Sequence, residues 1–250
     1  MPSMASVQHP SLEQRCSIMI YAFWEGRMPE YLKLCMETWR FPYVLLNYDN
    51  LNKYTDLPID KLKRFSIMQV SDVVRVHVLR DQGGYWLDTD TIMVGNELPK
   101  TTFVGDNESR INSIGYLYAK EPHMPIFEEW AKYQDLIVNG TEVSDWWALM
   151  ANSFSDPYLK AHKDIEIGNI YDYWLETTNE EDRHRKYLQY YFRINYMPDE
   201  LPPMIMLHNS WTPKWYKNLS REEVLAQNCT LSNILRHLFD FRRTFLSDDI

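Results

Sequence analysis

Short apolar runs alternate with a helically spaced segment at the beginning of this chain. Residues 17–23 and 41–46 are almost continuously apolar and predict two buried strands. Residues 29–39 carry apolar side chains at helical spacing and predict a helix between them. The order strand, helix, strand is typical of an α/β fold in which a mainly parallel, Rossmann-type sheet is flanked by helices. Such a sheet binds its ligand beyond the carboxyl ends of its strands.

The next region is predominantly helical and has a clear end. Pro58 is expected to begin a helical stretch that continues to Arg80, either as one helix or as two with Ser71 capping the second. Gly83 and Gly84 follow, and glycine is favoured where a helix ends in left-handed backbone conformation. The sequence therefore predicts a helix that stops at this pair and leads directly into a strand.

Two acids interrupt the strand that follows. Residues 85–94 are apolar apart from the segment that carries Asp88 and Asp90. Side chains at positions i and i+2 of a strand point to the same side, so both carboxylates are expected on one face. Paired carboxylates are oxygen ligands that suit Mg²⁺ or Mn²⁺. Upstream, Asp72 and Arg75 lie three residues apart and would share one face of the preceding helix.

The rest of the chain continues the mixed pattern. Strands are expected at 102–105 and 114–118, and an amphipathic helix at 124–138. A short apolar strand at 204–207 leads to His208, Ser210 and Trp211. A capping box at Ser220 opens the C-terminal helices, which are expected within 219–250. No internal repeat is visible, so we expect one catalytic domain over 1–250 with a loose polar leader at 1–15.

Composition narrows the class of protein. Apolar residues make up 45% of the chain, which is ample for a core. The net charge of −9 argues against nucleic acid as the main partner. No apolar run approaches the ~20 residues that span a bilayer, which leaves peripheral membrane contact through the last helix as the alternative to simple packing. We expect a cytoplasmic protein, although glycosylation sequons at Asn107, Asn139, Asn218 and Asn228 leave open a lumenal domain whose anchor has been removed.

Two stretches resemble a known family. The stretch 71–90, S-D-V-V-R followed by G-G-Y-W-L-D-T-D, resembles the signature of the DXD-type sugar-transferase family. That family includes initiating mannosyltransferases and capsular polysaccharide glycosyltransferases and, more distantly, the large glucosylating bacterial toxins. The stretch 208–211, H-N-S-W, resembles the family's closing motif, although the spacing of its histidine and serine differs. The resemblance implies a GT-A-like architecture.

The resemblance also implies an activity. It is a metal-dependent transfer of a hexose from a UDP- or GDP-sugar to a glycan or another hydroxyl acceptor, with retention of anomeric configuration. Mn²⁺ or Mg²⁺ would be held by Asp88, Asp90 and His208, and catalysis would depend on Asp88, Asp90 and Arg75. The implied donor-binding residues are Trp24, Asp72, Arg75, Tyr85, Asp88, Asn112, Ser210 and Trp211. Trp24 would stack on the nucleobase, whereas a structural role in the core is the alternative for an aromatic residue at a strand end.

Other functions remain open from the residues alone. A metal-dependent phosphohydrolase would also use clustered Asp and His, but it predicts further metal-ligating acids that the sequence does not suggest. A non-catalytic nucleotide- or glycan-binding protein is the third alternative. Asp145 is either catalytic or, together with Ser144, the cap of a helix.

Overall fold

The computed structural model describes residues 19–106, 108, 110–140, 151–169 and 180–246. Within this part of the chain, six strands form a central sheet in the order β2-β1-β3-β6-β5-β7. Strand β1 pairs in parallel with β2 and β3, and β5 with β7, whereas β6 is antiparallel to β3 and β5. The predicted α/β class with a mostly parallel, helix-flanked sheet is confirmed. The strands are β1 (Ile20–Phe23), β2 (Tyr43–Leu46), β3 (Gly84–Leu87), β5 (Phe103–Asp106), β6 (Ile111–Ala119) and β7 (Ile167–Asn169).

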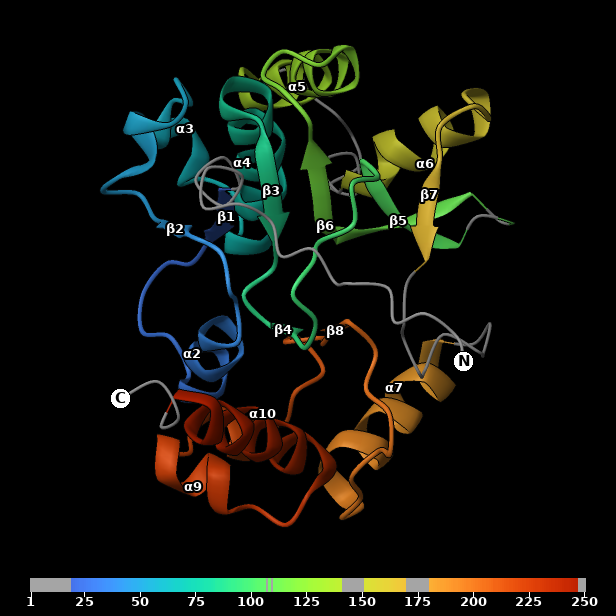
Figure 1. Ribbon diagram of the computed structural model, residues 1–250. Coiled ribbons are helices and arrows are strands. Elements are labelled where there is room, and N and C mark those ends of the chain that lie inside the picture. Colours follow the sequence, from blue (N-terminus) through green and yellow to red (C-terminus); the bar gives the residue numbers. More distant parts are fainter. Residues whose placement is uncertain (1–18, 107, 109, 141–150, 170–179, 247–250) are drawn as a thin grey trace.

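Helices lie on two sides of this sheet, above and below it in the view of Figure 1. On one side lie α3 (Ile59–Leu62), α4 (Ile67–Gln82), α5 (Pro125–Val138) and α6 (Ala151–Ala161). On the other lie α2 (Glu30–Glu37), α7 (Glu180–Leu188), α8 (Lys214–Lys217), α9 (Arg221–Ala226) and α10 (Thr230–Leu246). The C-terminal helices therefore begin close to where the sequence predicts them. No helix among the described residues is long and apolar enough to cross a membrane.

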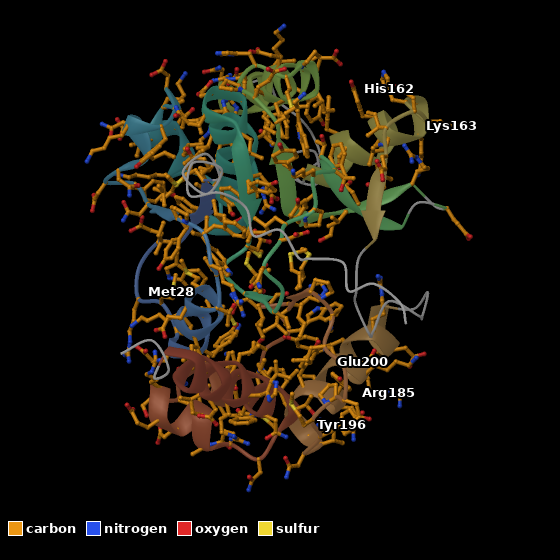
Figure 2. All side chains as sticks on the ribbon, viewed as in Figure 1. Met28, His162, Lys163, Arg185, Tyr196 and Glu200 are labelled. Atoms are coloured by element: carbon orange, nitrogen blue, oxygen red, sulfur yellow. The ribbon has the colours of Figure 1, made fainter. Side chains whose placement is uncertain are left out.

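The alternation of strand side chains divides the core into two clusters. In β1, Ile20 and Ala22 contribute to the cluster beneath α2 and the C-terminal helices, while Tyr21 and Phe23 contribute to the cluster beneath α4 and α5. In β3, Tyr85 belongs to the first cluster and Trp86 to the second. Side chains fill the space between the sheet and its helices on both sides (Figure 2). The nearly continuous apolar runs in the sequence thus reflect strands that are buried on both faces.

The region from Pro58 to the glycine pair contains two helices, and the second begins about one turn before the predicted cap at Ser71. Helix α4 is capped by Ser66, whose hydroxyl accepts from the Gln69 N–H, while the Gln69 side chain accepts from the Ser66 N–H in return. The alternative with Ser71 as the cap is wrong, because Ser71 lies inside α4. The extended backbone of Ser66 (ψ 153°) places the break between the helices there.

The predicted stop at the glycine pair is confirmed. Gly83 ends α4 with φ 66°, and its N–H donates to the Leu79 carbonyl over 2.9 Å. Gly84 also has positive φ (85°), and a Cβ there would lie 2.6 Å from the Met19 carbonyl oxygen. Glycine at both positions therefore lets α4 turn directly into β3.

The strand predicted over 85–94 is interrupted. Strand β3 ends at Leu87, and Asp88, Thr89 and Asp90 form a turn that is closed by a hydrogen bond from the Thr91 N–H to the Asp88 carbonyl over 3.0 Å. Strand β4 (Thr91–Met93) then leaves the central sheet and pairs antiparallel with β8 (Met204–Met206). The expectation that the two acids project from one continuous strand is therefore wrong. They lie on a turn between two sheets.

Candidate active site

A cavity of about 480 Å³ lies at the carboxyl ends of β1 and β3. Its lining comes from five places that are distant in the sequence: the end of β1, the first turns of α4, the turn after β3, one residue of β6 and the segment after β8. The lining residues are Phe23, Trp24, Glu25, Ile67, Met68, Ser71, Asp72, Arg75, Asp88, Thr89, Asp90, Ile114, Leu207, His208, Asn209 and Ser210. The site thus forms where a Rossmann-type sheet is expected to bind a ligand.

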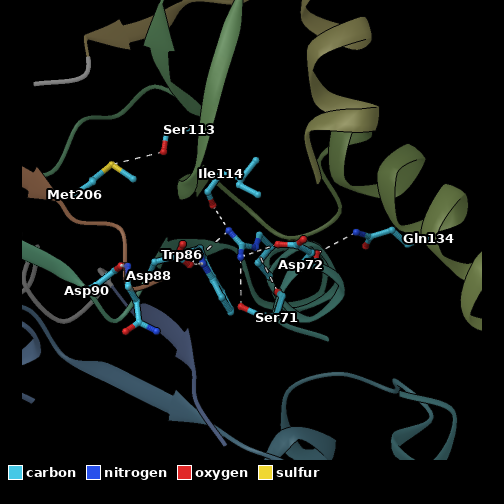
Figure 3. Close-up of polar contacts among 11 residues, drawn as sticks. Ser71, Asp72, Trp86, Asp88, Asp90, Ser113, Ile114, Gln134 and Met206 are labelled. Atoms are coloured by element: carbon cyan, nitrogen blue, oxygen red, sulfur yellow. Dashed lines mark hydrogen bonds and ion pairs between the residues drawn. The ribbon is translucent and has the colours of Figure 1, made fainter. Parts of the chain in front are cut away.

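Arg75 is the centre of the polar contacts in this cavity, and Figure 3 labels its partners Ser71, Asp72, Asp88 and Ile114. Its side chain is 4% exposed, and its guanidinium lies 2.9 Å from the Asp72 carboxylate and 3.5 Å from that of Asp88. It also donates to the Ile114 carbonyl and, over 3.3 Å, to the Ser71 hydroxyl. Because neutral and anionic acceptors surround it, the guanidinium is held in one orientation.

The Asp72–Arg75 pair is buried and is not an idle surface ion pair. Burial raises the pKa of Asp72 to about 6, and the nearby Arg75 opposes this rise without cancelling it. The Asp88 charge acts in the same direction as burial. Asp72 is therefore mainly ionised at neutral pH, and it remains so inside the protein because a cation lies beside it.

Trp86 supports both Arg75 and Asp88, a role that was not predicted from the sequence. Its indole Nε1 donates to Asp88 Oδ1 over 2.8 Å, and the Arg75 guanidinium lies over its ring at 5.1 Å. A signal was present, because Trp86 and Asp88 are two positions apart and strand alternation places them on one side.

Asp90 is buried beside Asp88. Its Oδ2 accepts a hydrogen bond from the backbone N–H of Asn209 over 2.6 Å. Burial, and then the charge of Asp88, raise the pKa of Asp90 to about 7. The Asp88 carboxylate is thus close enough to oppose the ionisation of Asp90.

His208 reaches the same cavity from the segment after β8. Burial lowers the pKa of His208 to about 4, so its imidazole is neutral at neutral pH and offers a nitrogen lone pair. Its ring packs on that of Trp211, with the centroids 4.2 Å apart. Ser210 lines the cavity and is exposed, whereas Trp211 supports His208 from behind and is outside the lining. The structure therefore brings the H-N-S-W stretch to the same cavity as Asp88 and Asp90.

The cavity carries an excess of negative charge. Its acids are Glu25, Asp72, Asp88 and Asp90, and its guanidinium is that of Arg75. Asp88 and Asp90, with the neutral His208, offer the donor atoms that suit Mg²⁺ or Mn²⁺. Across the part of the chain that the structure describes, no three His, Cys, Asp or Glu side chains are already arranged as a complete set of metal ligands. A cation here would need ligands from water or from a bound substrate as well.

Comparison with known proteins identifies the family of this chain. Residues 3–233 match a family model described as capsular polysaccharide synthesis protein, which covers nearly the whole chain. The chain belongs to the capsular polysaccharide synthesis protein family. The expected membership of a sugar-transferase family is thereby confirmed. No curated protein matches the chain.

One solved structure similar to this chain is the apo form of the glycosyltransferase GlyE from Streptococcus pneumoniae TIGR4. The two are 12% identical with a TM-score of 0.41, and the match covers 88% of this chain and 59% of GlyE. The chain therefore spans less than two thirds of the length of that relative.

Trp24 lies at the border between the core and the cavity. It packs against the core cluster beneath α2 and also lines the cavity. Its indole Nε1 is buried and has no hydrogen-bond partner among the described residues. Next to it, Glu25 accepts from the backbone N–H of Tyr48 over 3.1 Å, which ties the end of β1 to the turn after β2.

Three of the implied donor-binding residues are outside the cavity lining: Trp211, which packs on His208, and two that are buried elsewhere. Tyr85 is 3% exposed and stacks on Tyr118, with ring centroids 4.4 Å apart, on the opposite face of β3 from Trp86. Asn112 is also buried, and its Oδ1 accepts from the Ser155 hydroxyl over 2.7 Å. Neither residue is part of the cavity lining. Asn107, Ser144 and Asp145 lie outside the described residues.

Proposed function

We propose that this capsular polysaccharide synthesis protein transfers a hexose from a UDP- or GDP-sugar to a hydroxyl group of a glycan acceptor, with a divalent cation as cofactor. The observation that carries the proposal is the meeting of Asp72, Arg75, Asp88, Asp90 and His208 at one cavity. In the reaction, the bond between the anomeric carbon and the diphosphate oxygen breaks. The acceptor oxygen bonds to that carbon and gives up its proton.

The charge of the cavity supports a cation. A nucleoside diphosphate is itself anionic, and the cavity that would receive it carries more carboxylates than guanidinium groups. Mg²⁺ and Mn²⁺ sites often use one or two carboxylates together with substrate phosphates, which agrees with a protein ligand set that is incomplete without substrate. Asp88, Asp90 and His208 are the residues that would hold the ion. When bound, the ion would supply Lewis-acid neutralisation of the charge on the leaving diphosphate.

The remaining residues have separate roles in the proposal. Arg75 is a fixed positive charge beside the leaving group, and its orientation is set before the donor binds. Asp72 has a carboxylate that can accept hydrogen bonds from sugar hydroxyls. Trp24 offers an aromatic face to the nucleobase, and the exposed Ser210 hydroxyl can donate to a phosphate oxygen. Retention of anomeric configuration is included as the outcome implied by the family resemblance.

Donor hydrolysis in the absence of acceptor tests the proposal. The protein is incubated with UDP- and GDP-hexoses, with Mn²⁺ or with EDTA, and the released nucleoside diphosphate is measured by chromatography. We expect release that depends on the cation and is lost in Asp88→Asn. Release of inorganic phosphate from simple phosphomonoesters, without hydrolysis of any nucleotide sugar, would instead identify a phosphohydrolase. Nucleotide binding without turnover, either with or without glycan acceptors, would identify a binding protein.

A further inference from the structure

Helix α2 holds the small β4·β8 sheet from one side. The Trp39 indole donates to the Thr91 carbonyl over 2.8 Å, and the Met93 N–H donates to the Thr38 hydroxyl over 2.7 Å. Both contacts lie at β4, directly after Asp90. The C-cap of α2 and the residue after it thus fix the strand that leaves the Asp88–Asp90 turn.

The N-terminal half of the same helix reaches the segment that follows β8, the other strand of this small sheet. Tyr31 is completely buried, and its hydroxyl donates to Asn209 Oδ1 over 2.5 Å. Asn209 in turn donates its backbone N–H to Asp90 Oδ2 over 2.6 Å. Two short hydrogen bonds therefore connect α2 to the carboxylate, through a residue that is 178 positions away from Tyr31 in the sequence.

We propose that Tyr31 is a positioning residue, whose hydroxyl aims the Asn209 N–H at Asp90 and thereby orients this carboxylate toward the cavity. The inference rests on the proposed function, since the orientation of Asp90 matters there for holding the cation. Asn209 begins a tight turn in which the Thr212 N–H donates to the His208 carbonyl over 3.0 Å. With its side chain fixed by Tyr31, the direction of its N–H is fixed as well.

The step from hydroxyl to carboxylate has a physical basis. Burial raises the pKa of Tyr31 far above its ordinary value, so the phenol remains a hydrogen-bond donor throughout the working pH range. Loss of the Tyr31 hydroxyl leaves Asn209 Oδ1 without this partner, so the Asn209 side chain can rotate. Outer hydrogen bonds of this kind typically change metal affinity 10–100-fold when they are removed.

Tyr216 provides a matched control. It is also completely buried and packs edge-on against Tyr31, with ring centroids 5.7 Å apart. Its hydroxyl, however, is bonded to Ser232 over 2.9 Å and belongs to the contacts of α10. Tyr31→Phe and Tyr216→Phe therefore delete the same atom from the same core cluster, but only the first deletes a contact that leads to Asp90.

The experiment compares these two variants with the wild-type protein by three measurements. Calorimetry gives the Kd for Mn²⁺ in the presence of UDP, amide exchange by NMR reports on the Asn209 N–H, and thermal unfolding gives Tm. We expect Tyr31→Phe to weaken Mn²⁺ binding about 10-fold or more and to accelerate exchange at Asn209. Tyr216→Phe should have the same Tm as Tyr31→Phe. Its Kd for Mn²⁺ and its exchange rate at Asn209 should stay at the wild-type level. Asn209→Ala removes the acceptor instead of the donor, and the N–H of residue 209 should again exchange faster.

The outcomes separate this inference from the proposed function. Wild-type exchange at Asn209 and wild-type Mn²⁺ affinity in Tyr31→Phe would overturn the positioning role. Equal changes in Tyr31→Phe and Tyr216→Phe would also overturn it, because they would indicate general loosening of the core. If the wild-type protein binds no Mn²⁺, the metal in the proposed function fails, and exchange at Asn209 still decides whether Tyr31 holds that N–H in place.

Discussion

The Arg75 guanidinium lies 2.9 Å from the Asp72 carboxylate, and both side chains are buried. A charge that is removed from water in this way depends on its partner, so loss of one member leaves the other uncompensated. Replacing one member of such a pair typically costs about 3–5 kcal/mol in the free energy of unfolding.

We therefore expect Arg75→Gln to destabilise the protein by about 3–5 kcal/mol, measured by urea unfolding. Asp72→Asn should cost less in the Arg75→Gln background than in the wild-type protein, since its carboxylate is already unpaired there. A double-mutant cycle measures this difference directly. Additive effects of the two substitutions would contradict a coupled pair.

Asp90→Asn tests the role of the buried carboxylate. Removing its charge should lower kcat by at least ~100-fold, the scale expected for a lost electrostatic contact in the transition state. The wild-type protein should lose turnover in EDTA and regain it with Mn²⁺. Asp60→Asn is a suitable control, because Asp60 is exposed in the first turn of α3. Full activity of Asp90→Asn in EDTA would remove this carboxylate from the mechanism.

Trp24→Ala tests the nucleobase platform. Loss of an aromatic face that stacks on a base should weaken UDP or GDP binding by ~1–3 kcal/mol, measured by calorimetry. Trp24→Phe should keep most of the affinity, since it preserves a stacking ring. Trp215→Ala is the control, because Trp215 is 48% exposed and outside the cavity lining. Unchanged affinity in a folded Trp24→Ala protein would leave Trp24 with its packing role alone.

Gly115→Ala tests whether the position of the Asp88 carboxylate matters. A Cβ at this position would lie 3.1 Å from Asp88 Oδ2 and 2.6 Å from the Met206 methyl carbon. The methyl end of Met206 can move aside, so we expect the fold to survive while turnover falls. Met206→Ala combined with Gly115→Ala makes room for the new methyl group and should recover part of the rate. Wild-type kinetics in Gly115→Ala would show that Asp88 tolerates displacement.

His77 predicts a dependence of stability on pH. It is 2% exposed on α4, its Nε2 lies 3.7 Å from Asp135 Oδ1, and burial and then Arg80 lower its pKa to about 3, with Asp81 opposing. An unfolded histidine titrates near 6.5, so the unfolded chain gains a proton at a higher pH than the folded protein. The stability due to neutral His77 is fully present above pH 6.5 and falls by about 1.4 kcal/mol per unit as pH decreases toward 3.

Comparing the wild-type protein with His77→Leu isolates the contribution of His77 to the pH dependence of stability. Chemical unfolding at pH 7.5 and pH 5.0 should show the wild-type protein losing about 2 kcal/mol more than the variant over this interval. Parallel losses in both proteins would assign the acid sensitivity to other groups.

Local patterns predicted much of this fold. The opening strand, helix and strand, the helix stop at Gly83 and the Asp72–Arg75 pair depend on residues within one or two turns of each other. Their signals are carried by spacing and backbone preference, which a sequence shows directly. The cap at Ser66 shows the limit of such signals, because Ser66 and Ser71 are both plausible caps until the backbone conformation is known.

The turn at Asp88–Asp90 could not be predicted in the same way. Apolar residues flank it on both sides, and the sequence reads as one strand. The apolar residues after the turn form β4, which pairs with β8 and not with the central sheet. Strand β8 comes more than a hundred residues later. Tyr85 is a different case, since strand alternation alone places it on the face opposite Asp88, and the family resemblance obscured that rule. Asn209 carried no local signal, because its role comes from contacts with Tyr31 and Asp90.

The pairing of β4 with β8 also fixes when the site can form during synthesis. Thr91 pairs with Met206, so β4 leaves the ribosome long before its partner exists. A nascent chain that ends before β8 already contains Asp72, Arg75, Asp88 and Asp90, but it has no Asn209 N–H to hold Asp90 and no His208. Because a protein is synthesised starting at its N-terminus, the acidic residues are made first. The segment that positions them is made last. The growing chain thus carries the acids of the cavity without a working site until the ribosome has passed the H-N-S-W stretch.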